Sequence, residues 1–166
     1  YIPTDGASAT RNQELCNNAT PVINSEEGTL YAEISALVKA GGGTRRIEIG
    51  NSLNPSQYVR IQIGNGNGSL YVDVTNNSGQ QVLFNYTSFN ATQNNKIAIK
   101  YKENDFALWV NGVEVGTDTN GATFSDNTLT KLNFGGGATI FYGNTKDLKY
   151  YPKALADVQL EDLTTI

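Results

Sequence analysis

Several residue types that commonly carry chemistry are missing from this chain or rare in it. Its 166 residues include no histidine and no methionine, and Cys16 is the single cysteine. Histidine is the commonest general base and a frequent zinc ligand, so its absence weakens every hydrolase and zinc-enzyme interpretation. A lone cysteine forms no disulfide within the chain. We interpret Cys16 as a small apolar residue, with an intermolecular bridge or a reactive thiol as the alternative.

Charged residues and long apolar runs are scarce as well. Charged residues make up 17% of the chain, and the 12 basic and 16 acidic residues leave a net charge of −4. Nucleic-acid binding requires a basic stripe, and the densest basic stretch here is only the pair Arg45-Arg46. No stretch approaches the roughly 20 apolar residues of a membrane span. We therefore expect a soluble protein that neither binds nucleic acid nor inserts into a membrane.

Uncharged polar residues and glycine are abundant instead. The chain holds 20 asparagines, 17 threonines and 17 glycines, a composition typical of β-proteins with many turns. From Leu30 onward, apolar residues alternate at a period of two, which predicts half-buried strands. We expect about ten short strands of an antiparallel sandwich or barrel. Their apolar positions lie within residues 30–36, 47–49, 59–63, 70–74, 82–86, 97–101, 106–110, 113–115, 132–134 and 139–151.

Two stretches in the last third of the chain carry more specific patterns. Residues 104–117 read NDFALWVNGVEVGT, where Asn111-Gly112 supplies the positive φ angles of a type I′ hairpin turn. Residues 141–163 read FYGNTKDLKYYPKALADVQLEDL, a strand that ends in a short helix over 157–163. We expect the inner side of this helix to carry Leu155, Val158, Leu160 and Leu163.

In this order and this close to the C-terminus, the two stretches resemble the concanavalin A-like (LamG-like) jelly-roll domains. Those domains often end in L-Y-V-N-G followed by F-x-G-x-I-D-x-V-R-I-Y-x-x-A-L-S-D-A-E-I. The resemblance implies an all-β, antiparallel jelly-roll β-sandwich with one short C-terminal helix over residues 29–166. Residues 1–28 are then an irregular lead-in or edge segment. Their sequence pattern, Y-I-P-T…A-T-R, resembles segments that precede such domains in bacteriophage structural and tail-fibre proteins.

The resemblance also implies a function. We expect a non-catalytic carbohydrate-binding or adhesion module of a larger virion protein, such as a phage tail fibre, or of a secreted extracellular protein. Its partners would be a cell-surface or extracellular polysaccharide and other copies or domains of the same fibre. The alternative is a purely structural packing module of a filament, fibre or capsid that binds no glycan. Low charge and polar, neutral faces fit either function.

Alternation along the strands indicates which side chains point away from the core. Aromatic rings accept the C–H face of a sugar, and planar amide, guanidinium and carboxylate groups bridge adjacent hydroxyls. Trp109 is the single tryptophan; it either contacts glycan or packs under a neighbouring element. The alternation does not say which of two sheets each strand joins. The outward residues that we predict to contact glycan are Trp109, Tyr71, Tyr58, Arg60, Gln62 and Asp73.

Catalysis and metal binding have weaker support. The related glucanases carry E-x-D-x-x-E or E-x-D-x-E on one strand, and this chain has no such run. Glu48 and Asp73 could meet from different strands, but we expect no enzyme. The resemblance makes Ca²⁺ a possible ligand, although no cofactor is required, because many LamG-like domains hold it through oxygen donors. Asp147 matches the family's I-D position and is the candidate ligand, with turn capping as the alternative.

Overall fold

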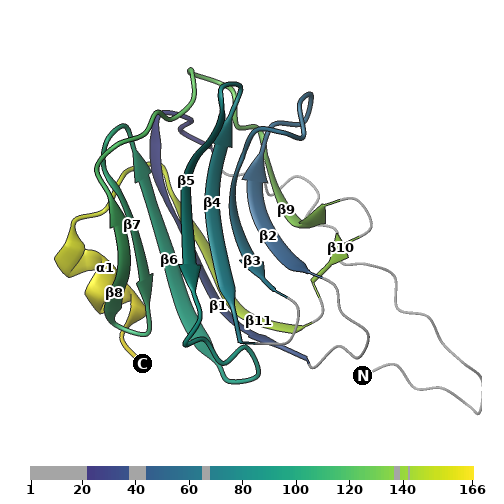
Figure 1. The fold of residues 1–166 in the computed structure, drawn as a ribbon, viewed down its shortest axis with the longest axis vertical. Coiled ribbons are helices and arrows are strands. Elements are labelled where there is room, and N and C mark those ends of the chain that lie inside the picture. Colours follow the sequence, from purple (N-terminus) through teal and green to yellow (C-terminus); the bar gives the residue numbers. More distant parts are fainter. Residues whose placement is uncertain (1–21, 38–43, 65–67, 137–138, 142) are drawn as a thin grey trace, which may run out of the picture.

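A computed structural model describes residues 22–37, 44–64, 68–136, 139–141 and 143–166. Within these residues the chain forms strands and one short helix, so the predicted all-β class is confirmed. Figure 1 shows the elements in place. They are β1 (Glu27–Ala36), β2 (Arg45–Gly50), β3 (Tyr58–Ile63), β4 (Leu70–Asn76), β5 (Gly79–Tyr86), β6 (Asn95–Lys102), β7 (Phe106–Val110), β8 (Val113–Asp118), β9 (Lys131–Gly136), β10 (Thr139–Ile140), β11 (Gly143–Tyr151) and α1 (Asp157–Thr164).

The strands form two antiparallel sheets. One has the order β11-β1-β6-β7-β8 and the other the order β10-β9-β2-β3-β4-β5. In both sheets strands far apart in sequence are neighbours, as β9 and β2 are, so the chain crosses between layers rather than meandering through one. In the view of Figure 1, β2 to β5 lie over β1 and β11, and α1 lies at the β7–β8 side. The architecture is a β-sandwich with one short C-terminal helix, as expected.

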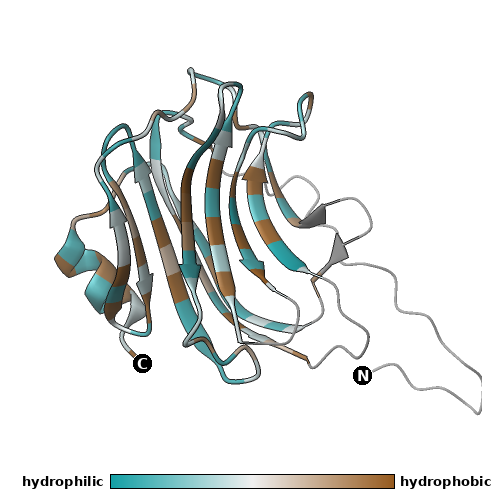
Figure 2. Cartoon of the chain, in the orientation of Figure 1, coloured by the Kyte–Doolittle hydropathy of each residue, from teal (hydrophilic) through white to brown (hydrophobic). Residues whose placement is uncertain are grey.

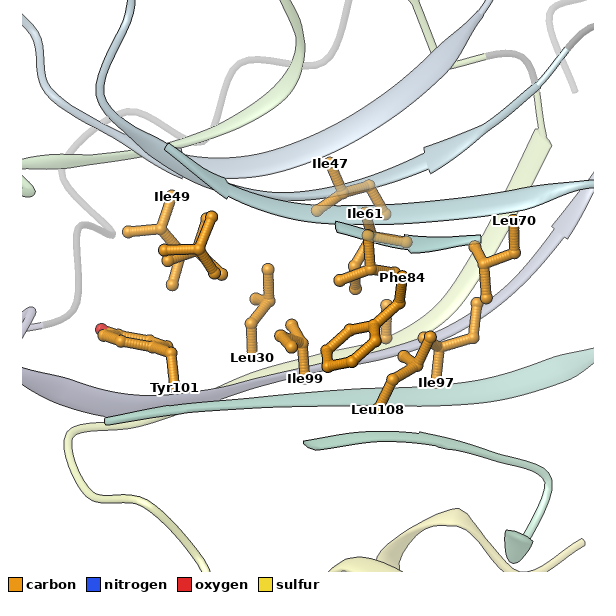
Figure 3. Close-up of a cluster of buried hydrophobic side chains, with 14 of the residues drawn as sticks. Leu30, Ile47, Ile49, Ile61, Leu70, Phe84, Ile97, Ile99, Tyr101 and Leu108 are labelled. Atoms are coloured by element: carbon orange, nitrogen blue, oxygen red, sulfur yellow. The ribbon is translucent and has the colours of Figure 1, made fainter. Parts of the chain in front are cut away.

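The core lies between the two sheets and follows directly from the alternation. Figure 2 shows hydrophobic and hydrophilic bands alternating along β2, β3 and β4. Ile61 and Ile99, two of the buried members, have at most 1% of their surface exposed. In Figure 3 they point from the two sheets toward one another, with Tyr101 at one end of the layer. Because every second residue on each strand faces inward, the intervening residues form two outer faces.

The predicted hairpin is confirmed in its details. β7 and β8 pair antiparallel with Val110 opposite Val113. Asn111 and Gly112 have φ angles of 52° and 81°, which are the two positive values of a type I′ turn. The Asn111 side chain also accepts a hydrogen bond from the Lys96 amide at 2.9 Å, which ties the turn to the start of β6.

The strand predicted over 139–151 is instead two strands in different sheets. β10 pairs with β9 in the six-stranded sheet, whereas β11 pairs with β1 in the five-stranded sheet. Gly143 stands at the start of β11, where a Cβ would lie 3.0 Å from the Ser35–Ala36 backbone or closer. The chain changes sheets at this point, and only glycine allows so close an approach. Alternation alone could not reveal the change, since both parts are extended.

The C-terminal helix is confirmed within one residue of its predicted end. It covers the outer face of β6 and β7, where Leu160 is fully buried and Leu155 and Leu163 pack beside it. The prediction for Val158 is wrong, because that side chain is 63% exposed. Leu160 and Thr164, four residues apart, define the buried side instead. Among the described residues, no helix is long and apolar enough to cross a membrane.

The described residues just before and at the start of the first strand already contact the sandwich. β1 begins at Glu27, and Asn24 already bonds to Tyr101 and Tyr150 of the sandwich through its carbonyl oxygen. Ser25 is fully buried. Residues 1–21 of the predicted lead-in, which include Cys16, lie outside the described residues.

Candidate functional site

The outer face of the six-stranded sheet carries polar side chains in register. The strand pairing places Glu48, Arg60 and Asp73 side by side on β2, β3 and β4. Two residues further along, another row crosses four strands. We call the first set the paired row. The second, which we call the open row, consists of Arg46, Gln62, Tyr71 and Asn85. Neighbouring strands lie about 4.8 Å apart and same-face residues about 6.6 Å apart along a strand, so both rows form one continuous surface.

Two members of the paired row, Arg60 and Asp73, neutralise each other. Arg60 donates two hydrogen bonds to the Asp73 carboxylate, at 2.9 and 2.8 Å. Its guanidinium also lies 4.0 Å from the centre of the Tyr58 ring and donates to the Tyr58 hydroxyl. Asp73 is 3% exposed, and a buried carboxylate is stable only with such a bidentate partner. The Arg60 and Asp73 side chains therefore hold each other in place and have little hydrogen-bonding capacity left for a ligand.

The open row has the opposite character. Arg46 donates through Nε to Gln62 Oε1 at 2.7 Å. Within the described part of the chain, no hydrogen bond or ion pair engages the terminal nitrogens of Arg46, the Gln62 amide nitrogen, the Tyr71 hydroxyl or the Asn85 side chain. Asn85 is exposed and the other three are half-buried. The row thus presents donors and acceptors in fixed places on a solvent-facing sheet.

Tyr71 is held by a close approach at the end of β3. A Cβ on Gly64 would lie only 2.7 Å from the edge of the Tyr71 ring. The absence of a side chain at Gly64 therefore lets the ring pack against the backbone beside Gln62. An aromatic ring fixed in this way can stack against the C–H face of a sugar while its hydroxyl stays available.

Glu48 and Asp73 are not arranged as a pair of catalytic carboxylates. They lie on β2 and β4 with β3 between them, and Arg60 stands between them in the row. Arg60 bonds to Asp73, while Glu48 is 9% exposed and receives one long contact, 3.4 Å, from Asn133. A glycosidase places its substrate between the two carboxyl groups. Here a guanidinium occupies that space.

Trp109 lies on the other sheet, apart from the five remaining predicted ligand residues. It is 8% exposed and packs with Tyr31, Ala107 and Leu160 beneath α1. The structure thus gives Trp109 the packing role that was the alternative in the sequence interpretation. The reason is that α1 covers the outer face of this sheet, which strand parity could not show.

Asp147, the candidate calcium ligand, is engaged by a cation of the protein. It forms an ion pair with Lys149 on the same strand, and this pair raises the pKa of Lys149. Opposite it on β1, Glu33 bonds to Lys146 at 2.7 Å, which lowers the pKa of Glu33. No group of three or more acidic or sulfur ligands that could hold a metal occurs in the residues described. Calcium binding at Asp147 therefore stays a prediction.

A separate hollow of about 500 Å³ lies at one end of the sandwich. Its walls include Asn24, Lys102 and Phe124, together with Glu27, whose carboxylate is 4.0 Å from the Lys102 ammonium. Glu26 and Glu103 also line the hollow, so its walls carry three acids and one lysine.

The family follows from these features and from a direct match. The family model of the concanavalin A-like lectin/glucanases superfamily matches residues 11–160. The chain belongs to this superfamily. A search of curated protein sequences gives no match.

Solved structures confirm the fold at low sequence identity. The CBM40 domain of the Ruminococcus gnavus IT-sialidase matches with a TM-score of 0.68 and 17% identity, covering 86% of this chain and 85% of that one. Domain 4 of AbnA, an extracellular arabinanase from Geobacillus stearothermophilus solved with arabinotriose, gives 0.66 and 15%, covering 88% and 70%. A leech intramolecular trans-sialidase, solved with 2,7-anhydro-Neu5Ac, gives 0.68 and 20%, covering 86% and 24%. This chain thus spans about a quarter of the leech enzyme.

Sequence reasoning missed two residues of the open row. Tyr71 and Gln62 were predicted as ligand contacts, and the structure places them side by side. Arg46 and Asn85 share their outward parity but were not selected. The pairing register of neighbouring strands could have identified them, because it shows which outward residues lie side by side. No single strand carries that information.

Proposed function

We propose that this chain is a non-catalytic glycan-binding module and that the open row on the six-stranded sheet contacts the saccharide. The single observation that carries the proposal is the unengaged hydrogen-bonding capacity of Gln62, Tyr71 and their row neighbours, beside the paired Arg60 and Asp73. A saccharide offers many hydroxyls and an apolar ring face, which amide, phenol and guanidinium groups complement.

The solved neighbours support the same function. Carbohydrate-binding modules are among them, including the R. gnavus CBM40 domain in structures bound to α2,3- and α2,6-sialyllactose. In the leech enzyme the matching part is a minor share of the whole chain, which fits a module that serves a larger protein. The proposed setting is an extracellular protein or a virion fibre. An open sheet face binds saccharide weakly, since a millimolar Kd corresponds to about −4 kcal/mol, and display in several copies on a fibre raises the effective affinity.

The test is a glycan-array screen of the purified domain beside Tyr71→Ala and Tyr71→Phe. Tyr71→Ala removes the ring and hydroxyl, and we expect loss of at least tenfold in binding. Tyr71→Phe keeps the ring and removes one hydroxyl, so it should lose less. Trp109→Phe is the matched control on the opposite sheet, because it changes an aromatic residue that lies under α1.

Two results would contradict the proposal. One is an array on which folded wild-type protein gives no signal while size-exclusion or light-scattering measurements show self-association. That result favours the structural packing module. The other is glycan binding that Tyr71→Ala leaves unchanged, which moves the saccharide site away from the open row.

A further inference from the structure

The two arginines of the polar face differ in their partners. Arg60 is neutralised by Asp73, which accepts two of its hydrogen bonds, at 2.9 and 2.8 Å. Arg46 has only the neutral Gln62 as a partner among the described residues. The acid that follows Arg46 on the same face of β2 is Glu48, about 6.6 Å further along the strand. Glu48 forms no ion pair with it and instead contacts Asn133.

A hydrogen bond to Gln62 orients the Arg46 guanidinium and leaves its two terminal nitrogens without a partner among the described residues. The bond from Nε to Gln62 Oε1, at 2.7 Å, uses one edge of the guanidinium. Four N–H groups on the two terminal nitrogens remain, and a planar guanidinium matches a carboxylate with two parallel hydrogen bonds. Arg46 is half-buried, so its charge is partly removed from water without a counter-ion. An anionic group of a ligand supplies the counter-ion that the described residues do not provide for Arg46.

The residues next to Arg46 in the open row can form hydrogen bonds with the rest of a sugar whose anionic group lies at Arg46. Gln62 and Tyr71 follow in register on β3 and β4, so the row from Arg46 to Tyr71 extends about 10 Å. This length suits one monosaccharide unit that presents a carboxylate at one end and hydroxyls along its ring. We propose that the open row prefers a carboxylate-bearing saccharide, with Arg46 holding the carboxylate. The inference rests on the proposed function and names its ligand class.

The experiment compares matched acidic and neutral ligands by isothermal titration calorimetry. One pair is an oligogalacturonide and its methyl ester, and the other is 3′-sialyllactose and lactose, so the two common sources of a sugar carboxylate are separated. The proteins are wild type, Arg46→Gln, Arg46→Lys and Lys153→Gln. Lys153 is exposed in the segment between α1 and β11, a strand of the other sheet. Its substitution matches the charge change, and thermal unfolding of each variant verifies the fold.

We expect wild type to bind the acidic member of at least one pair about ten- to a hundredfold more tightly than the neutral member. Arg46→Gln should abolish that difference, Arg46→Lys should keep part of it, and Lys153→Gln should keep all of it. The preference should also weaken as salt rises.

Equal affinity for acidic and neutral members overturns the inference, as does a preference that survives Arg46→Gln. An array on which only neutral glycans bind, with loss in Tyr71→Ala, also overturns it but leaves the proposed function intact. Absence of binding to every saccharide, by a folded protein, overturns the proposed function itself.

Discussion

The two outer faces of this sandwich arise from the same alternation along the strands, but they differ in how much of their surface is covered. On the six-stranded sheet, Gln62 and Tyr71 are partly accessible, and Asp73 is bonded to Arg60 on the same face. On the five-stranded sheet, Trp109 and Ala107 are buried beneath α1. The difference is the C-terminal helix α1, which packs over the five-stranded sheet, whereas no helix among the described residues covers the other sheet.

The comparison shows that an aromatic residue pointing away from a core is not thereby a ligand contact. Trp109 and Tyr71 both point from their strands away from the core between the sheets. What separates them is the partner: Trp109 packs with Leu160 of α1, whereas Tyr71 packs at its edge against Gly64 and keeps its hydroxyl free. Burial by a distant segment therefore decides whether an outward residue stabilises the fold or is available to bind.

The largest effect should come from the covered face. Trp109→Ala removes a nearly buried indole between β7 and α1, and we expect the free energy of unfolding to fall by about 3–5 kcal/mol. Chemical denaturation measures the loss. Glycan binding of the protein that remains folded should be unchanged, and a variant that keeps its stability but loses binding would reverse the roles assigned to the two faces.

A pair of glycines sharpens the contrast between the core and the open sheet face. At Gly116 a new Cβ would lie 2.6 Å from the Phe84 ring in the core, so Gly116→Ala should cost about 1–3 kcal/mol. At Gly50 the nearest atoms are 3.4 to 3.9 Å away, which is ordinary contact, so Gly50→Ala should change stability by about 0.5 kcal/mol or less. Thermal melts of the two variants test the difference, and similar costs would argue against the assigned faces.

The buried tyrosines at the end of the sandwich should make the fold sensitive to alkaline pH. Burial raises the pKa of Tyr101 and of Tyr150 above the ordinary value, most strongly at Tyr101. The unfolded chain therefore releases these protons first, and stability that is complete below about pH 10 is lost as pH rises further. Each such group contributes a slope of up to about 1.4 kcal/mol per pH unit.

Tyr101→Phe tests this linkage. It should lower stability at neutral pH by about 1 kcal/mol, because the hydroxyl donates to the Asn24 carbonyl at 2.6 Å. Between pH 10 and 11 the slope of its stability against pH should be shallower than that of wild type. Urea denaturation across this range gives both slopes, and equal slopes would show that Tyr101 ionises as easily in the folded chain as in the unfolded one.

The smallest effect concerns the ion pair that links the five-stranded sheet to α1. Lys100 lies 3.2 Å from Asp157 and 2.7 Å from Asp105, and the hydrogen bonds to these two acids raise its pKa against the opposing effect of burial. Asp157→Asn leaves Asp105 in place, and Asp157 is exposed, so we expect a loss of at most about 1 kcal/mol. Denaturation at low and high salt should show the loss fading with salt. A larger loss would mean that the helix depends on charge rather than on Leu160.

Local sequence patterns predicted the strands and the β7–β8 hairpin because both depend on neighbouring residues. Alternation gave the inner side of each strand, and Asn111-Gly112 gave the turn. The change of sheet at Gly143 was missed because close backbone approach leaves no periodic signal. The exposure of Val158 was missed because a short helix admits more than one buried side.

The candidate site could be predicted only in part. Tyr71 and Gln62 were selected from parity and chemistry and stay predictions, whereas placing Trp109 required knowing what covers its sheet. Arg46 was not selected because what singles it out is the lack of an acidic partner among the described residues, and the contrast with Arg60 becomes visible only once β3 and β4 are paired. Register and coverage are long-range properties, and no local pattern encodes them.

The most direct test of the account is a two-dimensional ¹H–¹⁵N NMR titration with the saccharide that gives the strongest array signal. The account predicts shifts concentrated on the outer face of β2, β3 and β4, around Arg46, Gln62 and Tyr71. Shifts concentrated instead at the end of the sandwich around Lys102 and Phe124, or along α1 and Trp109, would contradict it.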